Sequence, residues 1–387
     1  MTETRKTLEL ASLDVFWLHQ LQRGLSYEFD TFFTSTWSLK RGGPNPDLPR
    51  RNIWPMHYAL QANKMLPSLQ FGNRMYSALV AAFDATLCTV VEPQNSDAFV
   101  PLSGVALWSG RMFQRAGKPV VLECGSTHTD HQHQVVFEEN TRNGIHEPLF
   151  PTSYRDRVRQ EFIEADFINL PSRFVARTFV KAGIPVEKLF INPYGTDTSR
   201  FLPREADDLE RPFRAICPSG VNLRKGARIL AEAWRRLGWK DAELHWIGDP
   251  SPTSRHLFNP MPPGIVWHGH MDHENLSALY CSCDVLVLPS FEEGFARVLV
   301  ESAASGLALI ATPETGVEDF FTAGEPEGWL IPSNSVDALC VALEQAKANR
   351  EKTRSIGLQA AARSRHGFSV EDYGKRALEN FRKVLGA

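Results

Sequence analysis

Strand-type and helix-type segments alternate along almost the whole chain. Short apolar runs, such as residues 213–217 and 308–311, are separated by longer stretches in which apolar residues recur with a helical period. This alternation is typical of parallel sheets covered by helices. The expected strands are residues 27–36, 98–101, 119–124, 167–171, 189–193, 213–217, 243–247, 265–268, 284–289, 308–311 and 328–331. The expected helices are residues 14–25, 74–89, 106–116, 155–165, 174–182, 226–237, 275–281, 295–305, 335–348 and 370–385.

One long stretch, residues 38–56, interrupts this pattern. It contains four prolines and four basic residues, which predicts a long loop. Two interpretations stay open: contact with anionic lipid or an acceptor glycan, or a plain solvated loop. The residues that support a contact are Lys40, Arg41, Arg50, Arg51 and Trp54.

Length and composition restrict the class of protein. A chain of 387 residues is too long for one hydrophobic core and fits two α/β domains. The net charge of −3 gives no reason to expect a nucleic-acid partner. Six cysteines do not suggest a disulfide framework, and we find neither a secretory signal nor an apolar run long enough to span a membrane. We therefore expect a cytoplasmic protein, either free or peripheral on the inner face of the membrane.

The most informative segment is residues 289–320. A buried strand is expected to end at Pro289, and a helix is expected to open near Gly294 after a polar loop. Free backbone N–H groups and the positive end of a helix dipole favour an anion such as a diphosphate there. Glu293 and Glu301 could accept hydrogen bonds from sugar hydroxyls. The alternative is that Glu293 only complements the helix dipole and that Glu301 is a solvated helix residue.

The run E-G-F-A-R-V-L-V-E that ends at Glu301 resembles the E-x7-E signature of family 4 glycosyltransferases. The similarity continues over residues 165–201, with the pattern A-D…S…P-x-G-x-D…F, and over residues 223–237, with the R-K-G…L-x-x-A-W pattern of a helix. Two places depart from the family: Leu307-Ala308 replaces the usual Leu-Pro, and residues 218–221 lack the usual Gly-Arg.

This resemblance covers residues 160–385 strongly and the first 150 residues only weakly. It implies an α/β protein of the GT-B fold, with two facing Rossmann-like domains and parallel sheets. Residues 1–198 would bind the acceptor and residues 199–368 the nucleotide sugar, while residues 369–387 would form a helix that returns to the N-terminal domain. The implied activity is retaining transfer of a sugar from a nucleoside-diphosphate donor. The implied acceptor is a hydroxyl of a glycan, lipid-linked or small molecule, in cell-surface polysaccharide or glycoconjugate synthesis.

The resemblance also implies roles for single residues. The donor-binding positions would be Arg224, Lys225, Gly269, Met271, Glu293, Gly294, Phe295, Ala296 and Glu301. Glu301 would bind the ribose, Glu293 the transferred sugar, and the backbone from Gly269 to Met271 the base.

The diphosphate would be held by backbone N–H groups of residues 294–296. Arg224 and Lys225 would neutralise its charge as it leaves. Such fixed cations replace a metal ion in this family, so we expect neither a metal nor another cofactor. The alternative for Arg224 and Lys225 is an exposed loop before a helix. The catalytic candidates implied by the resemblance are Lys225, Glu293 and His128.

Residues 123–139 follow a strand, where an active-site loop belongs in an open α/β sheet. They resemble a G-S-x-H…Q…E-E loop found in some of these enzymes, which points to His128 as the residue nearest the reacting centre. The acceptor-binding candidates are Asp14, Ser126, Thr127 and His128.

The same loop must be weighed as a metal site, because H-T-D-H resembles metallo-hydrolase loops. The candidate ligands are His128, Asp130, His131 and His133. Ser126 stands where such a motif needs a histidine, and no distant motif completes the ligand set. The other alternative for His131 and His133 is that they are surface loop residues.

Other functions remain to be separated from transfer. A Rossmann dehydrogenase needs a G-x-G-x-x-G turn after its first strand, and neither half contains one. A sugar phosphorylase or an epimerase would share the fold. A catalytically inactive glycan- or nucleotide-binding relative is the non-enzyme alternative, which the joint presence of Lys225, Glu293 and Glu301 disfavours.

Overall fold

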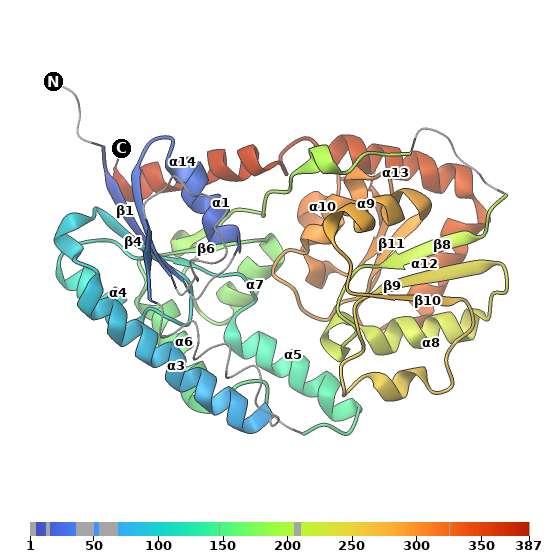
Figure 1. Cartoon of the computed structure of the whole chain (residues 1–387), viewed down its shortest axis with the longest axis horizontal. Helices are drawn as coiled ribbons and strands as arrows, with labels where there is room; N and C mark the ends of the chain where they lie inside the picture. The colour runs from blue at the N-terminus through green and yellow to red at the C-terminus, as the bar shows by residue number, and fades with distance from the viewer. Residues whose placement is uncertain are drawn as a thin grey trace.

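The computed structural model describes residues 5–12, 16–35, 50–53, 69–146, 148–204, 210–324 and 326–386. Asp14 and most of the stretch 38–56 lie outside these residues. The chain forms two α/β domains that lie side by side, the N-terminal one in blue to green and the C-terminal one in yellow to red (Figure 1). Within the described ranges, no helix is both long enough and apolar enough to cross a membrane.

The N-terminal domain is built on parallel strands. They are β1 (Thr7–Ser12), β2 (Asp30–Ser35), β3 (Arg50–Asn52), β4 (Ala98–Pro101), β5 (Val121–Glu123), β6 (Phe167–Leu170) and β7 (Leu189–Ile191). Their order is β3-β2-β1-β4 and β5-β6-β7, and parallel bridges from Phe99 to Val120 and from Leu102 to Glu123 join the two groups. The helices of this domain are α1 (Phe16–Leu25), α3 (Leu69–Val90), α4 (Leu107–Arg115), α5 (Thr129–Arg142), α6 (Thr152–Glu164) and α7 (Arg173–Lys181).

The C-terminal domain has one parallel sheet in the order β10-β9-β8-β11-β12-β13. Its strands are β8 (Phe213–Cys217), β9 (Ala242–Ile247), β10 (Ile265–Gly269), β11 (Val285–Leu288), β12 (Ala308–Ala311) and β13 (Gly328–Leu330). Its helices are α8 (Ala227–Leu237), α9 (His273–Ser282), α10 (Arg297–Ala304), α11 (Val317–Phe320), α12 (Val336–Ala348) and α13 (Arg350–Ser364). This order reverses between β8 and β11, and ligands of open α/β sheets bind at the carboxyl ends of strands at such a switch point.

The core explains why the central strands read as apolar runs. Strands β11 and β12 are buried at every position, as expected for a parallel sheet covered on both faces. Helix α8 buries one face, and its Trp234 is 1% exposed and donates its indole N–H to the Pro263 carbonyl at 2.8 Å. The helix ends at Gly238, which has a left-handed backbone.

Helix α14 (Val370–Leu385) leaves the C-terminal domain and packs on α1 in the N-terminal domain, as Figure 1 shows. Gly24 and Gly374 let the two helices approach closely, because a Cβ on Gly24 would lie 2.7 Å from the Gly374 Cα. Arg376 donates to the Asn192 side chain at 2.9 Å and to the Pro193 carbonyl at 2.7 Å. The chain end therefore ties the two domains together beside the linker.

The expected alternation of strands and helices is confirmed, with several differences. Strand β1 was not predicted, because Leu, Glu and Ala in its sequence favour a helix. Helix α13 was missed because its buried side carries the small residues Gly357, Ala360 and Ala361 instead of large apolar ones. The loop expected at residues 38–56 contains the short strand β3.

Candidate donor and acceptor site

The R-K-G segment forms a tight turn between β8 and α8. Residues Leu223–Lys225 make a 3-10 turn, which Asn222 caps by accepting a hydrogen bond from the Lys225 backbone N–H at 3.1 Å. Gly226 has φ +75°, and a Cβ there would lie 2.0 Å from the Pro289 carbonyl oxygen. Only glycine allows this approach, so the turn sits against the end of β11.

That approach brings two cations against two carboxylates at the switch point. The Lys225 ammonium contacts Glu293 Oε1, and Arg224 Nη1 donates to Glu292 Oε2 at 3.0 Å. Arg224 also donates to the Glu292 carbonyl at 2.8 Å and lies 3.9 Å from Glu293 Oε2. Arg224 and Lys225 do lie in a turn before a helix, as the alternative expects, but their side chains are 32% and 18% exposed and are paired with carboxylates. A bound diphosphate would have to share these cations with the carboxylates.

Glu292 was not singled out from the sequence, yet it is the most enclosed acid of the site, at 0% exposure. It accepts hydrogen bonds from the backbone N–H and hydroxyl of Thr127, at 3.2 and 2.9 Å, and from Gln132 at 3.3 Å. Burial raises the pKa of Glu292, but the charge of Arg224 and these hydrogen bonds outweigh burial and hold the pKa below its usual value. The doubled glutamate before Gly294 was the only signal in the sequence.

The N-terminal end of helix α10 lies at a different residue from the one expected. The helix begins at Arg297 and not near Gly294, and the Ala296 N–H donates to the Thr315 carbonyl at 3.0 Å. The prediction that the Ala296 N–H holds phosphate is therefore wrong for this arrangement, because that donor is already used. Gly294 meets the other domain: a Cβ there would lie 2.0 Å from the Gly125 carbonyl oxygen, and its own carbonyl accepts from Ser172 at 2.7 Å.

Other predicted donor positions lie on the same domain. Glu301 is 5% exposed on α10, so the alternative that it is a solvated helix residue is wrong. Gly269 ends β10, and its carbonyl accepts from the Gly248 N–H at 2.6 Å. Met271 follows it and is half-buried against the core. The structure thus brings Gly269 and Met271 to the sheet edge that carries the R-K-G turn.

The expected loop at residues 123–139 is mostly helix α5, which is a correction to the sequence interpretation. His128 is the N-cap of that helix, and its Nδ1 accepts a hydrogen bond from the Asp130 N–H at 3.3 Å. The ring is 4% exposed and lies 5.2 Å from the ring of Phe162 and 5.3 Å from that of Phe179. Burial lowers the pKa of His128, which favours the neutral ring.

The residues weighed as metal ligands have other roles here. Asp130 accepts hydrogen bonds from Arg159, from Nε at 2.8 Å and from Nη2 at 2.5 Å. His131 and His133 lie on α5 and not on a loop. In the part of the chain that the structure describes, no group of three or more His, Cys, Asp or Glu side chains is placed to hold a metal ion.

A cavity of about 200 Å³ opens in the N-terminal domain at the carboxyl end of β5. Hydroxyl, amide and aromatic groups line it, including Ser103, Ser126, Thr127, Thr129, Gln132 and Tyr154. The Tyr154 ring lies 5.0 Å from that of Phe150, which adds an apolar wall. Two predicted acceptor residues, Ser126 and Thr127, thus border one cavity, and Thr127 also contacts Glu292 of the other domain.

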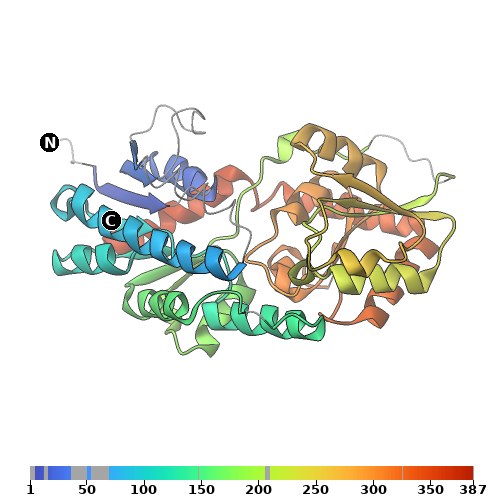
Figure 2. The same cartoon turned by 60° about the horizontal axis from the view of Figure 1, so that its bottom comes forward.

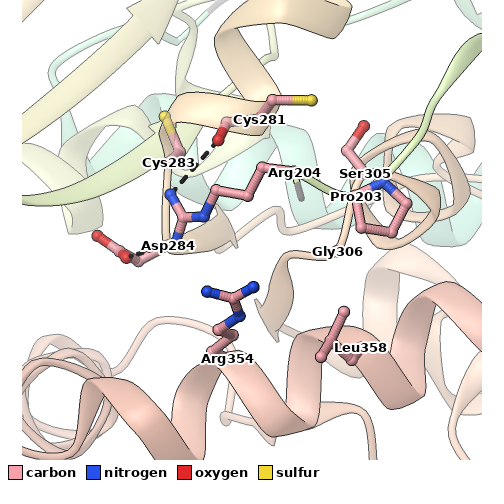
Figure 3. Close-up of a pocket in the computed structure, with 9 residues that line it drawn as sticks. All are labelled: Pro203, Arg204, Cys281, Cys283, Asp284, Ser305, Gly306, Arg354 and Leu358. Atoms are coloured by element: carbon pink, nitrogen blue, oxygen red, sulfur yellow. Dashed lines mark hydrogen bonds and ion pairs between the residues drawn. The ribbon is translucent and has the colours of Figure 1, made fainter. Parts of the chain in front are cut away.

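A second polar cluster lies at the opposite edge of the C-terminal sheet, before β11 begins (Figure 3). Asp284 is paired with Arg211 at 2.9 Å, with Arg350 at 3.2 Å and with Arg204 at 3.5 Å. Arg204 also donates to the Cys281 carbonyl at 3.4 Å. The adjoining cavity measures only about 10 Å³, room for about one water molecule. This cluster joins the end of the linker to α13.

Sequence comparison finds a known family that the C-terminal domain matches. Residues 213–349 match the sequence model described as Glycosyl transferases group 1. The chain is 25% identical over 231 residues to the putative colanic acid biosynthesis glycosyltransferase WcaL of Salmonella typhimurium, covering 56% of this chain and 57% of that protein. It is 25% identical over 203 residues to the MMP alpha-(1->4)-mannosyltransferase of Mycolicibacterium hassiacum, covering 51% and 49%. The chain thus matches about half the length of these relatives.

Solved structures resemble the chain over its whole length. The sucrose-phosphate synthase of Thermosynechococcus elongatus has a TM-score of 0.73 at 16% identity, covering 99% of this chain and 100% of that one. Anabaena HepE in complex with UDP has a TM-score of 0.70 at 16% identity, covering 98% and 100%. At such low sequence identity, these structures are evidence for the fold alone. The chain therefore has the GT-B fold, and residues 213–349 of its C-terminal domain match the group 1 glycosyl transferases.

Proposed function

We propose that this protein is a retaining glycosyltransferase that moves a sugar from a nucleoside-diphosphate donor to a hydroxyl of a glycan, lipid-linked or small-molecule acceptor. Its process would be cell-surface polysaccharide or glycoconjugate synthesis, in the cytoplasm or at the inner membrane face. The similarity to WcaL supports the process, and the likeness to HepE, solved with UDP, supports the donor class. We propose no metal or other cofactor.

The observation that carries this proposal is the meeting of the R-K-G turn with Glu293 at the switch point. Lys225 and Arg224 stand at the carboxyl edge of the sheet, where a diphosphate would lie, and Lys225 contacts Glu293. We assign the diphosphate to Arg224 and Lys225, the transferred sugar to Glu293, and the ribose to Glu301. A cation placed beside a leaving diphosphate stabilises charge that develops as the bond breaks.

The proposed reaction needs no enzymic nucleophile. The bond between the sugar anomeric carbon and the diphosphate oxygen breaks, and the acceptor oxygen bonds to the same face of that carbon. The proton of the acceptor hydroxyl passes to an oxygen of the leaving diphosphate, so that charge and atoms balance. Lys225 and Arg224 stabilise the departing anion, and the acceptor enters from the cavity bordered by Ser126 and Thr127.

The first experiment is a thermal-shift screen with UDP, GDP and ADP, because a ligand that binds only the folded state raises stability by RT ln(1 + [L]/Kd). Donor hydrolysis by the purified protein then separates an enzyme from an inactive binding relative. Proton NMR of fresh product gives the anomeric outcome. An inverted linkage, or binding without any turnover, would overturn the proposal.

His128 remains a proposed catalytic residue that would act on the sugar and not on the phosphates. Its capping bond suggests the variant His128→Asn, because asparagine is a good N-cap and lacks the imidazole. If turnover falls while nucleoside-diphosphate affinity stays normal, the catalytic assignment holds. Near-normal turnover would leave His128 as the cap of α5.

A further inference from the structure

Glu292 lies between the two domains and its two carboxylate oxygens face different partners. Oε1 accepts both hydrogen bonds from Thr127, a residue 165 positions away in the chain. Oε2 accepts from Arg224 at 3.0 Å and from Gln132 at 3.3 Å. Oε1 therefore holds the loop that borders the N-terminal cavity, and Oε2 is shared between Gln132, which lines that cavity, and the cation proposed to bind the diphosphate.

The burial of Glu292 makes these contacts interdependent. A carboxylate with 0% exposure has no water to replace a lost donor, so its charge must be satisfied by its protein partners. If Thr127 gives up its hydroxyl bond, the carboxylate depends more heavily on Arg224. Arg224 is then held more firmly and is less available to another anion. With a neutral residue at position 292, the hold on Arg224 would no longer depend on the Thr127 hydrogen bond, because a neutral side chain does not attract the guanidinium as a charge does.

We infer that Glu292 is a positioning residue that couples the cavity beside Thr127 to the cation Arg224. This inference rests on the proposed function, because it assigns Arg224 to the donor diphosphate. Glu292 itself need not touch either substrate. Occupancy of the cavity and affinity for the diphosphate are then linked, and such a linkage is reciprocal between the two sites.

The test is a double-mutant cycle read out as nucleoside-diphosphate affinity. Calorimetry uses whichever of UDP, GDP and ADP binds the wild-type protein. Thr127→Val removes the hydroxyl but keeps the size, and it should weaken binding roughly fivefold, at the low end of typical coupling between sites. The same substitution should have no effect on affinity when it is made together with Glu292→Gln. Combined with Arg224→Lys it should also lose most of its effect.

Thr129→Val is the matched control. Thr129 lines the same cavity, and the structure shows no hydrogen bond between it and Glu292 among the described residues. Its substitution should leave nucleotide affinity unchanged. A general loss of packing would instead affect Thr127→Val and Thr129→Val alike.

Two results would overturn the inference: unchanged affinity in Thr127→Val, or the same loss of affinity in Thr127→Val whether or not Glu292 is present. If Glu292→Gln fails to fold, the cycle between Thr127→Val and Arg224→Lys still decides the question. Failure of the proposed function looks different, because then none of the three nucleotides binds the wild-type protein.

Discussion

Clusters of paired acidic and basic side chains lie at both ends of the strands of the C-terminal sheet, but their surroundings differ. At the amino edge, before β11, Asp284 pairs with three arginines at 2.9 to 3.5 Å, all from the same domain. At the carboxyl edge, two carboxylates, Glu292 and Glu293, meet Arg224 and Lys225. The first cluster encloses almost no space, whereas the second faces the other domain across the switch point.

The difference shows that an ion pair can have a structural role at one end of the strands of a parallel sheet and lie at a candidate binding site at the other end. At the amino edge the arginines converge on one 7%-exposed acid and fix the linker to α13. At the carboxyl edge Arg224 is paired with Glu292, and that carboxylate also accepts a hydrogen bond from Thr127 of the other domain. In both views the helix α5 reaches toward the C-terminal domain, where Glu139 pairs with Arg228 at 2.7 Å (Figures 1 and 2). A pairing of residues therefore indicates function only together with its place on the sheet.

The largest expected effect is on the amino-edge cluster. Asp284→Asn removes the charge that three arginines share, and breaking a buried ion pair typically costs about 3–5 kcal/mol of folding free energy. Urea denaturation should show this loss. The control is Asp337→Asn, which breaks the exposed pair with Arg236 and should leave stability almost unchanged. A stability of Asp284→Asn within about 1 kcal/mol of wild type would contradict a structural role for the cluster.

Next is the cation at the carboxyl edge. Lys225→Ala should lower kcat by roughly 10²- to 10³-fold with a smaller change in KM, because the charge matters most as the diphosphate leaves. Its loss of folding free energy should be smaller than that of Asp284→Asn. Lys347→Ala, which breaks a surface pair with Asp241, is the control for turnover. A change confined to KM would reassign Lys225 to ground-state binding.

A smaller effect is expected for the ribose assignment. Glu301→Ala should weaken nucleoside-diphosphate binding by about 1.5–3 kcal/mol, the worth of hydrogen bonds to a charged group. Calorimetry measures this difference, with Glu344→Ala on the exposed side of α12 as control. Unchanged affinity in Glu301→Ala would refute the ribose assignment and leave the comparison of the two edges intact.

The smallest effect per pH unit concerns Glu123, a buried acid that, unlike Asp284, is bonded to an amide. Burial raises its pKa to about 8, and Asn169 opposes this by donating at 2.9 Å. Between the unfolded pKa near 4.5 and about 8, the folded state keeps a proton that the unfolded state loses. The stability from this group is therefore complete below pH 4.5 and is lost as pH rises through 8, with a slope of up to roughly 1.4 kcal/mol per pH unit.

Glu123→Gln tests this sign, because glutamine has no proton to lose. Urea denaturation from pH 5 to 9 should give a wild-type stability that falls relative to the variant as pH rises. A constant difference between the two proteins would mean that Glu123 is ionised in the folded state, as Asp284 is. That result would make burial alone a poor guide to the charge of acids in this protein.

Sequence reasoning was most reliable where the pattern is local. Strands Phe213–Cys217 and Ala308–Ala311 were predicted with their observed bounds, because buried strands of a parallel sheet are continuous apolar runs. The R-K-G turn and the Glu293 segment were also identified, and the structure brings them into contact. What failed was the reading of residues 123–139 as a loop, because α5 has a polar sequence with a weak apolar face.

The sequence by itself determined the two-domain α/β class and the alternation of most strands and helices, since each element depends on residues close together in the chain. Only the tertiary structure decided that Glu292 joins the domains, that His128 turns into the N-terminal core and that the Ala296 N–H is already bonded. The physical reason is that these contacts depend on the approach of the two domains and on burial. Neither the approach of the domains nor the burial of a single polar side chain produces a repeating pattern of apolar residues in the sequence.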